Sequence, residues 1–169
     1  RLSGEVRDAL LADAAWRVVA PCTHALRCPM SEPENARHWC HHFATPPSEV
    51  FQDAAWRQLS LELGLDLGAL PYSFLCMERT SGTSGETPTQ TLEPPLSRVI
   101  GEARELKGHL RVLSCNAQGL TEKILQKRDA PALFKELKKG RHLPVYQWEE
   151  RSEKITGAKR PFCDLPRPS

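Results

Sequence analysis

The stretch that decides the fold is APCTHALRCPM, residues 20–30. It follows a short apolar run, residues 17–20, which we predict to be a strand that ends at the proline. Cys22 and Cys28 form a C-x5-C pair within it. Residues 21–47 are rich in Pro, Cys and His, so they can bury little apolar surface. We therefore expect this segment to depend on an external cross-link such as a metal.

A third cysteine, Cys40, follows in the segment WCHHF, residues 39–43. Thiolates are soft ligands that suit zinc or iron–sulfur clusters. The C-x5-C spacing fits neither the common zinc spacings nor the ferredoxin runs, so spacing leaves both a metal site and ordinary thiols open. A loop histidine is more often a hydrogen-bonded or solvated side chain than a ligand. The histidines that could complete a tetrahedral set are His24, His38, His41 and His42.

Periodicity and turn residues indicate the remaining elements. Helices are predicted over residues 5–15, 49–63 and 132–139, and strands over 72–77, 109–114 and 120–126. Cys76 lies inside an apolar strand pattern and is expected to be a buried thiol, whereas Cys163 is expected to be an ordinary thiol of the tail. The expected organisation is an N-terminal part over 1–78, a flexible linker over 79–97, a basic segment over 98–148 and a mostly disordered tail over 149–169.

Composition excludes some classes of protein. The chain has 169 residues with 40% hydrophobic residues, which suits one domain with a modest core. No window approaches the roughly 18 apolar residues of a membrane span, so we expect no contact with a membrane. Six cysteines are too few for a disulfide scaffold. The chain opens at Arg1 without a visible targeting segment, and we expect it to be part of a longer protein.

Charge is distributed unevenly. Residues 1–100 hold 8 Arg, no Lys and 12 acidic residues, whereas residues 101–160 hold 14 Lys plus Arg and 8 acidic residues. The basic segment is a candidate for contact with an anionic partner such as RNA, although a solvated helix face explains the charge equally well. The candidate phosphate contacts are Arg104, Lys107, Arg111, Lys123, Lys127, Arg128, Lys138, Lys139 and Arg141.

Four segments in order resemble a known family. They are APCTHALRCPM, WCHHF, YSFLCMER at residues 72–79, and a G-H-x5-C segment followed by glycine at residues 108–119. This set resembles the mitochondrial small-ribosomal-subunit family Rsm-twenty-two, also called the methyltransferase-like protein 17 family. The resemblance covers roughly residues 7–120. Thr23 stands where the family usually has proline.

The resemblance implies a ligand set and a fold. Its four-cysteine [4Fe–4S] cluster would fall on Cys22, Cys28, Cys40 and Cys115, with zinc as the alternative occupant. The implied fold is α+β: the last strands of a methyltransferase-like, Rossmann-type domain with an inserted cysteine-rich metal module and a basic C-terminal extension. Residues 17–20 and 72–77 would be the last two strands. The first strands and the glycine-rich cofactor loop would belong to a missing N-terminal half, so this chain should not bind S-adenosylmethionine alone.

Three function classes follow. The first is a structural, iron–sulfur-binding part of a mitochondrial matrix ribosomal protein or assembly factor, with small-subunit rRNA and ribosomal proteins as partners. The second is part of an rRNA methyltransferase whose catalytic half is missing here; the chain itself offers no nucleophile with an adjacent base. The third is a sensor of redox state or iron supply, which a zinc occupant would exclude because zinc has no redox chemistry.

Overall fold

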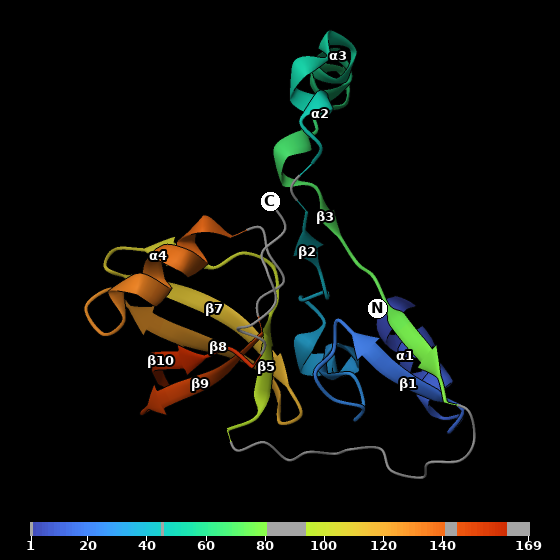
Figure 1. The fold of residues 1–169 in the computed structure, drawn as a ribbon, viewed down its shortest axis with the longest axis vertical. Coiled ribbons are helices and arrows are strands. Elements are labelled where there is room, and N and C mark those ends of the chain that lie inside the picture. Colours follow the sequence, from blue (N-terminus) through green and yellow to red (C-terminus); the bar gives the residue numbers. More distant parts are fainter. Residues whose placement is uncertain (1, 45, 81–93, 141–144, 162–169) are drawn as a thin grey trace.

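The computed structural model describes residues 2–44, 46–80, 94–140 and 145–161. Figure 1 shows an N-terminal region, up to residue 80, beside a β-barrel that begins after residue 94. Helices and strands in both regions agree with the predicted α+β class. Within these ranges even the longest helices, with 10 residues each, fall short of a membrane span.

The N-terminal region opens with a helix and a strand. Helix α1 (Leu2–Leu11) ends four residues before the predicted boundary, because the Asp13 carboxylate accepts a hydrogen bond from the Ala15 N–H at 2.9 Å and draws the chain into a turn. Strand β1 (Trp16–Ala20) confirms the predicted strand. It pairs antiparallel with β4 (Cys76–Arg79), so the two strands that flank the cysteine-rich segment lie together.

The strand predicted over 72–77 is divided in two. Its first part belongs to β3 (Pro71–Tyr72), which pairs antiparallel with β2 (His42–Phe43), and its last part belongs to β4. Cys76 is exposed, so the prediction of a buried thiol there is wrong. The apolar run suggested burial, but β4 lies in a sheet of only two strands, which leaves one of its faces open. Two 3-10 turns, Pro29–Ser31 and Pro33–Asn35, follow the C-x5-C loop.

The helix predicted over 49–63 is broken at Asp53. The pieces are α2 (Glu49–Gln52) and α3 (Ala54–Leu63), and the Asp53 carboxylate caps α3 by accepting from the Ala55 N–H at 2.8 Å. Gly64, left-handed at φ 62°, caps the C-terminal end of α3. A third 3-10 turn follows at Leu67–Ala69. Figure 1 shows α2 and α3 at one end of the molecule, away from the barrel.

The barrel is a closed sheet with one helix. In order its strands pair as β5-β9-β10-β8-β7, and β5 also pairs with β7, which closes the ring; β6 extends the edge of β7. All of these pairs are antiparallel except β8 with β10. The elements are β5 (Leu96–Val99), β6 (Arg104–Leu106), β7 (His109–Asn116), β8 (Gly119–Gln126), α4 (Pro131–Lys139), β9 (Val145–Arg151) and β10 (Lys154–Lys159).

One apolar core fills the barrel. Burial alternates along β7, so every second side chain points inward. Helix α4 closes the barrel with Phe134 and Leu137, and the Trp148 indole donates to the Ser114 hydroxyl at 2.9 Å inside it. The buried residues of this core are Val99, Leu110, Val112, Leu125, Phe134, Leu137, Tyr146, Trp148 and Ile155.

Two predicted boundaries change in the structure. The prediction of little structure in 149–169 is wrong for residues up to 161, because β9 continues to Arg151 and β10 follows it. Only Ile155 of β10 is fully buried, and its charged neighbours conceal the strand in the sequence. The linker predicted over 79–97 overlaps the first residues of β5, and its residues 81–93 lie outside the described residues.

Candidate metal centre

Helix α1 fixes the loop that carries the first two cysteines. The Arg7 guanidinium, 1% exposed, donates to the His24 carbonyl at 2.6 Å and to the Asp8 carboxylate at 2.6 Å. Asp8 accepts a hydrogen bond from the Cys28 backbone N–H at 3.2 Å. The loop that begins at Cys22 is therefore held in its middle and at its end by two neighbouring charged residues of one helix.

Cys28 is the most deeply buried of the candidate ligands. It is 6% exposed and packs with Met30 and Ile100. A Cβ added to Gly4 of α1 would lie 3.2 Å from the Cys28 sulfur, which is tighter than ordinary contact. The helix can approach this thiol so closely because residue 4 has no side chain.

Cys40 comes from a second segment that is attached to the start of the barrel. The Gly101 N–H donates to the His41 carbonyl at 2.9 Å, and a Cβ on Gly101 would come within 2.5 Å of the His41 ring. The Ser73 hydroxyl donates to the carbonyl of Cys40 itself. On the other side, the Nε2 of His42 lies 3.8 Å from the Cys40 sulfur.

Cys115 brings the barrel to the site. It lies on β7 between the buried residues Ser114 and Asn116, so its side chain faces outward, and it packs against the group around Cys28. Its register partner on β5 is Arg98. The residue that was predicted from resemblance therefore lies in the same apolar group as Cys28 and Cys40.

Two hydrogen bonds join the cysteine loop to β5. The Arg98 Nε donates to the Pro21 carbonyl at 2.7 Å, and the Thr23 hydroxyl donates to the Leu96 carbonyl at 2.8 Å. Thr23 thus has a structural use at the position where proline is usual in the resembling family. These bonds place the loop directly beside the strand that pairs with the Cys115 strand.

Three of the four thiols, those of Cys22, Cys40 and Cys115, have raised pKa values. Burial raises the pKa of Cys22, raises that of Cys40 to about 11 and raises that of Cys115 to about 12. Nearby cysteines raise all three pKa values further, whereas Arg7 opposes the rise at Cys22 and Cys115. Thiolates in this place need a positive group among them, and a metal centre supplies one.

A model of the family described as mitochondrial small ribosomal subunit Rsm22 matches residues 1–143. The chain belongs to this family. The match confirms the resemblance and extends beyond residue 120, where the motifs end, into the barrel. Among curated proteins no sequence matches the chain. Membership associates the protein with the mitochondrial small ribosomal subunit, indicates a mitochondrial location, and implies a methyltransferase-like fold.

In this Rsm22-family chain the sequence analysis missed the charged residues around the cysteines. Arg7 and Asp8 hold the loop. Burial lowers the pKa of Arg98, and the nearby cysteines Cys22, Cys40 and Cys115 oppose that shift. A charged residue within a helix or at a strand start is usually solvated. No pattern in the sequence indicates that these residues face the thiols.

The four candidate histidines lie in different surroundings. His24 is half-buried, its two ring nitrogens are buried without a partner among the described residues, and burial lowers its pKa to about 4. His38 accepts a hydrogen bond from Arg37, and the His41 ring stacks on Trp39. Burial also lowers the pKa of His42 to about 4, so this ring beside Cys40 is neutral near pH 7.

Across the described ranges, no three His, Cys, Asp or Glu side chains are placed to hold a single metal ion together. Cys76 is exposed on β4, and Cys163 lies outside the described residues. The four-cysteine ligand set therefore stays a prediction. It is supported by the position of Cys28, Cys40 and Cys115 in one packed group and by the electrostatic influence of Cys22 on Cys40 and Cys115.

The candidate RNA contacts divide into paired and unpaired cations. Arg111, Lys123 and Lys138 lie 2.8, 2.6 and 2.9 Å from Glu122, Glu150 and Glu105, respectively. Arg128 lies 3.7 Å from Asp129, a weak contact. Arg141 lies outside the described residues.

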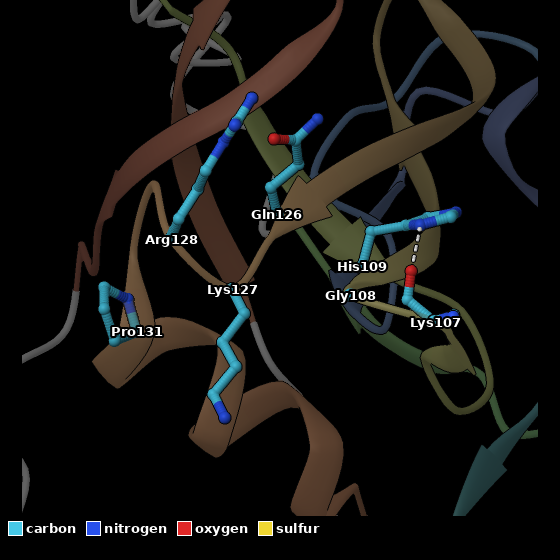
Figure 2. A pocket seen from close by; sticks show the side chains of 7 residues that line it. All are labelled: Lys107, Gly108, His109, Gln126, Lys127, Arg128 and Pro131. Atoms are coloured by element: carbon cyan, nitrogen blue, oxygen red, sulfur yellow. Dashed lines mark hydrogen bonds between the residues drawn. The ribbon is translucent and has the colours of Figure 1, made fainter.

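Three of the candidate lysines remain available. In the described part of the chain, Lys107, Lys127 and Lys139 have no carboxylate within ion-pair distance. Lys107 and Lys127 also line the same surface pocket, together with Gly108, His109, Gln126, Arg128 and Pro131. Figure 2 shows the residues from the start of β7 on one side of this pocket and those from the end of β8 and the start of α4 on the other.

Proposed function

We propose that this chain is the iron–sulfur-binding part of a mitochondrial small-subunit protein or assembly factor that contacts rRNA in the matrix and acts structurally. Cys22, Cys28, Cys40 and Cys115 are the proposed ligands of a [4Fe–4S] cluster. The observation that carries the proposal is the convergence of Cys28, Cys40 and Cys115, from three separate segments, on one packed group, with Cys22 near enough to influence Cys40 and Cys115.

A set of four cysteines suits either a [4Fe–4S] cluster or zinc, and the resemblance to the family is what favours the cluster. A zinc ion would draw four ligands to one centre at about 2.3 Å for each sulfur, whereas in a [4Fe–4S] cluster each thiolate binds its own iron at a separate corner. When bound, a cluster supplies cross-linking Fe–S bonds and a centre that oxidation can damage.

Charge near the site also fits an anionic cluster. Four thiolates around a [4Fe–4S] core give a net negative group, which needs compensation when it is buried. Arg7 and Arg98 approach from opposite sides of the loop, one from α1 and one from β5. Arg7 Nε is buried without a hydrogen-bond partner among the described residues and so remains able to donate.

The structural role follows from which elements the ligands join. Cys22 and Cys28 belong to the loop after β1, Cys40 precedes β2, and Cys115 is on β7 of the barrel. Their shared centre would hold the N-terminal region against the barrel, which carries most of the available cations. Closing so long a connection restricts the unfolded chain strongly.

The test is to purify the full chain without oxygen and to measure iron, sulfide, zinc and the visible spectrum. We expect about four irons per native chain. The iron should be lost in Cys28→Ser and in Cys115→Ser, and it should be kept in Cys76→Ser. Cys76→Ser is the matched control because it changes the same atom at an exposed position. One zinc per chain would mean that the chain is a zinc-binding RNA module and not an iron–sulfur protein. A folded chain without metal would refute the proposal.

The rRNA contact has a separate test. Binding of the metal-loaded chain to small-subunit rRNA fragments should weaken steeply as salt is raised, because phosphate contacts release counterions. A flat salt response would contradict this part of the proposal. Methyl transfer to RNA is the alternative function of the family fold, and upstream sequence with a glycine-rich loop after a first strand would favour it.

A further inference from the structure

The barrel has a topology that is associated with one kind of ligand. With β5, β7, β8, β9 and β10 taken as strands one to five, the pairing order is 1-2-3-5-4-1, strands three and five are parallel, and α4 lies between strands three and four. This is the topology of the OB-fold, whose second and third strands and neighbouring loops bind oligonucleotides or oligosaccharides. The corresponding surface here is the outer face of β7 and β8.

The N-terminal region covers one end of that face. Cys115 and its partner Leu120 pack with Leu113 against Cys28 and Met30. The other end of the same two strands, where His109 pairs with Gln126, is open. The pocket lies there, with a volume of ≈ 710 Å³. The fold therefore leaves half of the usual binding face available.

The chemistry of the open end favours a phosphate-bearing chain over a neutral sugar. Lys107 and Lys127 line the pocket and have no carboxylate partner among the described residues. The Arg128 side chain is 80% exposed and only loosely paired with Asp129. By contrast, the cations Arg111 and Lys123 of the same strands are already paired with glutamates, so along β7 and β8 the unpaired positive charge lies at the pocket end.

Two further side chains suit nucleotide bases. His109 presents an imidazole at the pocket, with its Nδ1 3.3 Å from the Lys107 carbonyl, and a flat ring of this kind stacks on unpaired bases. Gln126 supplies an amide that can both donate to and accept from a base edge. Figure 2 shows both side chains at the rim of the pocket, on the paired ends of β7 and β8.

We infer that this pocket binds an unpaired stretch of RNA, with Lys107, Lys127 and Arg128 on phosphates and His109 stacked on a base. The inference rests on the proposed rRNA contact and adds its place and its ligand class. Cys115 lies six positions along β7 from His109, a distance of about 20 Å. The RNA pocket is therefore separable from the cysteine site.

The experiment uses the full, metal-loaded chain and measures fluorescence anisotropy with a 12-nucleotide oligouridine and with an RNA hairpin of equal charge. The pocket variant is Lys107→Gln/Lys127→Gln. The matched control is Arg57→Gln/Lys159→Gln, which removes two exposed cations away from the pocket, one on α3 and one on β10. Metal content is recorded for each variant, so that loss of the cysteine site is detected separately.

The expected result is roughly ten-fold weaker binding of oligouridine by the pocket variant near 0.15 M salt, with the salt slope reduced by about 1.4. The control should bind within about two-fold of the native chain. His109→Ala should weaken binding by about ten-fold, and His109→Phe should restore most of it because stacking needs a flat ring.

Other outcomes separate this inference from the proposed function. If the native chain binds RNA but the pocket and control variants lose affinity equally, the pocket is refuted while the rRNA contact stands. A clear preference for the hairpin over oligouridine refutes an unpaired ligand. Failure of the native chain to bind either RNA refutes both.

Discussion

The two regions of this chain are held together by different means. The barrel encloses nine buried residues in one apolar core. Their side chains come from β5, β7, β8, β9, β10 and α4. In the N-terminal region the buried apolar side chains that the structure describes are Pro21, Cys28 and Met30, and the last two need Ile100 from the barrel to complete their group. The barrel resembles an independent domain, whereas the N-terminal region is organised around thiols.

This difference shows which interactions stabilise each region. Apolar area removed from water stabilises at about 25 cal/mol per Å², so a region without a core needs another source. Here that source is a set of polar contacts from Arg7, Asp8 and Arg98 and, in our proposal, a metal centre. The comparison predicts that the two regions respond differently to metal loss and to core mutations.

The largest effect is expected on removal of the metal. Cys28→Ser, or chelation of the native chain, should expose the amides of residues 16–43 to rapid exchange while β7 and β8 stay protected, because binding energy at such sites is on the order of 10 kcal/mol and acts as folding energy. Hydrogen exchange with mass spectrometry measures both regions in one sample. Equal loss of protection in the barrel would show that the two regions form one cooperative unit.

A core mutation should reverse this pattern. Leu125→Ala removes a fully buried side chain from the barrel and should lower its free energy of unfolding by about 3 kcal/mol. Leu61→Ala is the matched control, since Leu61 is 74% exposed on α3. Urea unfolding is followed by fluorescence in a background in which Trp16, Trp39 and Trp56 are replaced by Phe, so that Trp148 alone reports on the barrel. A similar loss in both variants would contradict the description of the barrel as the cored region.

The contact between the regions is tested by Arg98→Met. Loss of its hydrogen bond to the Pro21 carbonyl and of its charge beside three cysteines should destabilise the loop by about 2 kcal/mol and hasten metal release. Arg17→Met is the control, because Arg17 forms an exposed pair with Glu78 at 2.6 Å. Metal release to a chelator is measured for both. If the rate of metal release from Arg98→Met equals that of the native chain, the loop is stabilised by its contacts with α1 alone.

The smallest effect is expected in α3. Trp56 is 43% exposed, so Trp56→Ala should change the free energy of unfolding of the isolated chain by less than about 0.5 kcal/mol. Chemical denaturation checks this value. A loss above about 2 kcal/mol would mean that the indole is buried in solution, and the N-terminal region would then possess a core of its own.

Local patterns predicted the barrel hairpin well. The strands predicted over 109–114 and 120–126 and the helix over 132–139 are confirmed as β7, β8 and α4, because alternation and helical periodicity are carried by adjacent residues. Patterns were less reliable where burial depends on a distant partner. The apolar residues of α3 face solvent, and β10 is held by neighbours on both sides that its own sequence does not show.

The sequence by itself determined the family, the uneven charge and the cysteines that could serve as ligands. Those features depend on residue types and spacing alone. Only the tertiary structure decided that Cys115 faces the same buried group as Cys28, that Arg7 and Arg98 lie beside the thiols, and that five strands close into a barrel with one open end. The reason is physical: strand pairing and burial are set by residues far apart in the chain, and no local pattern records which of them meet.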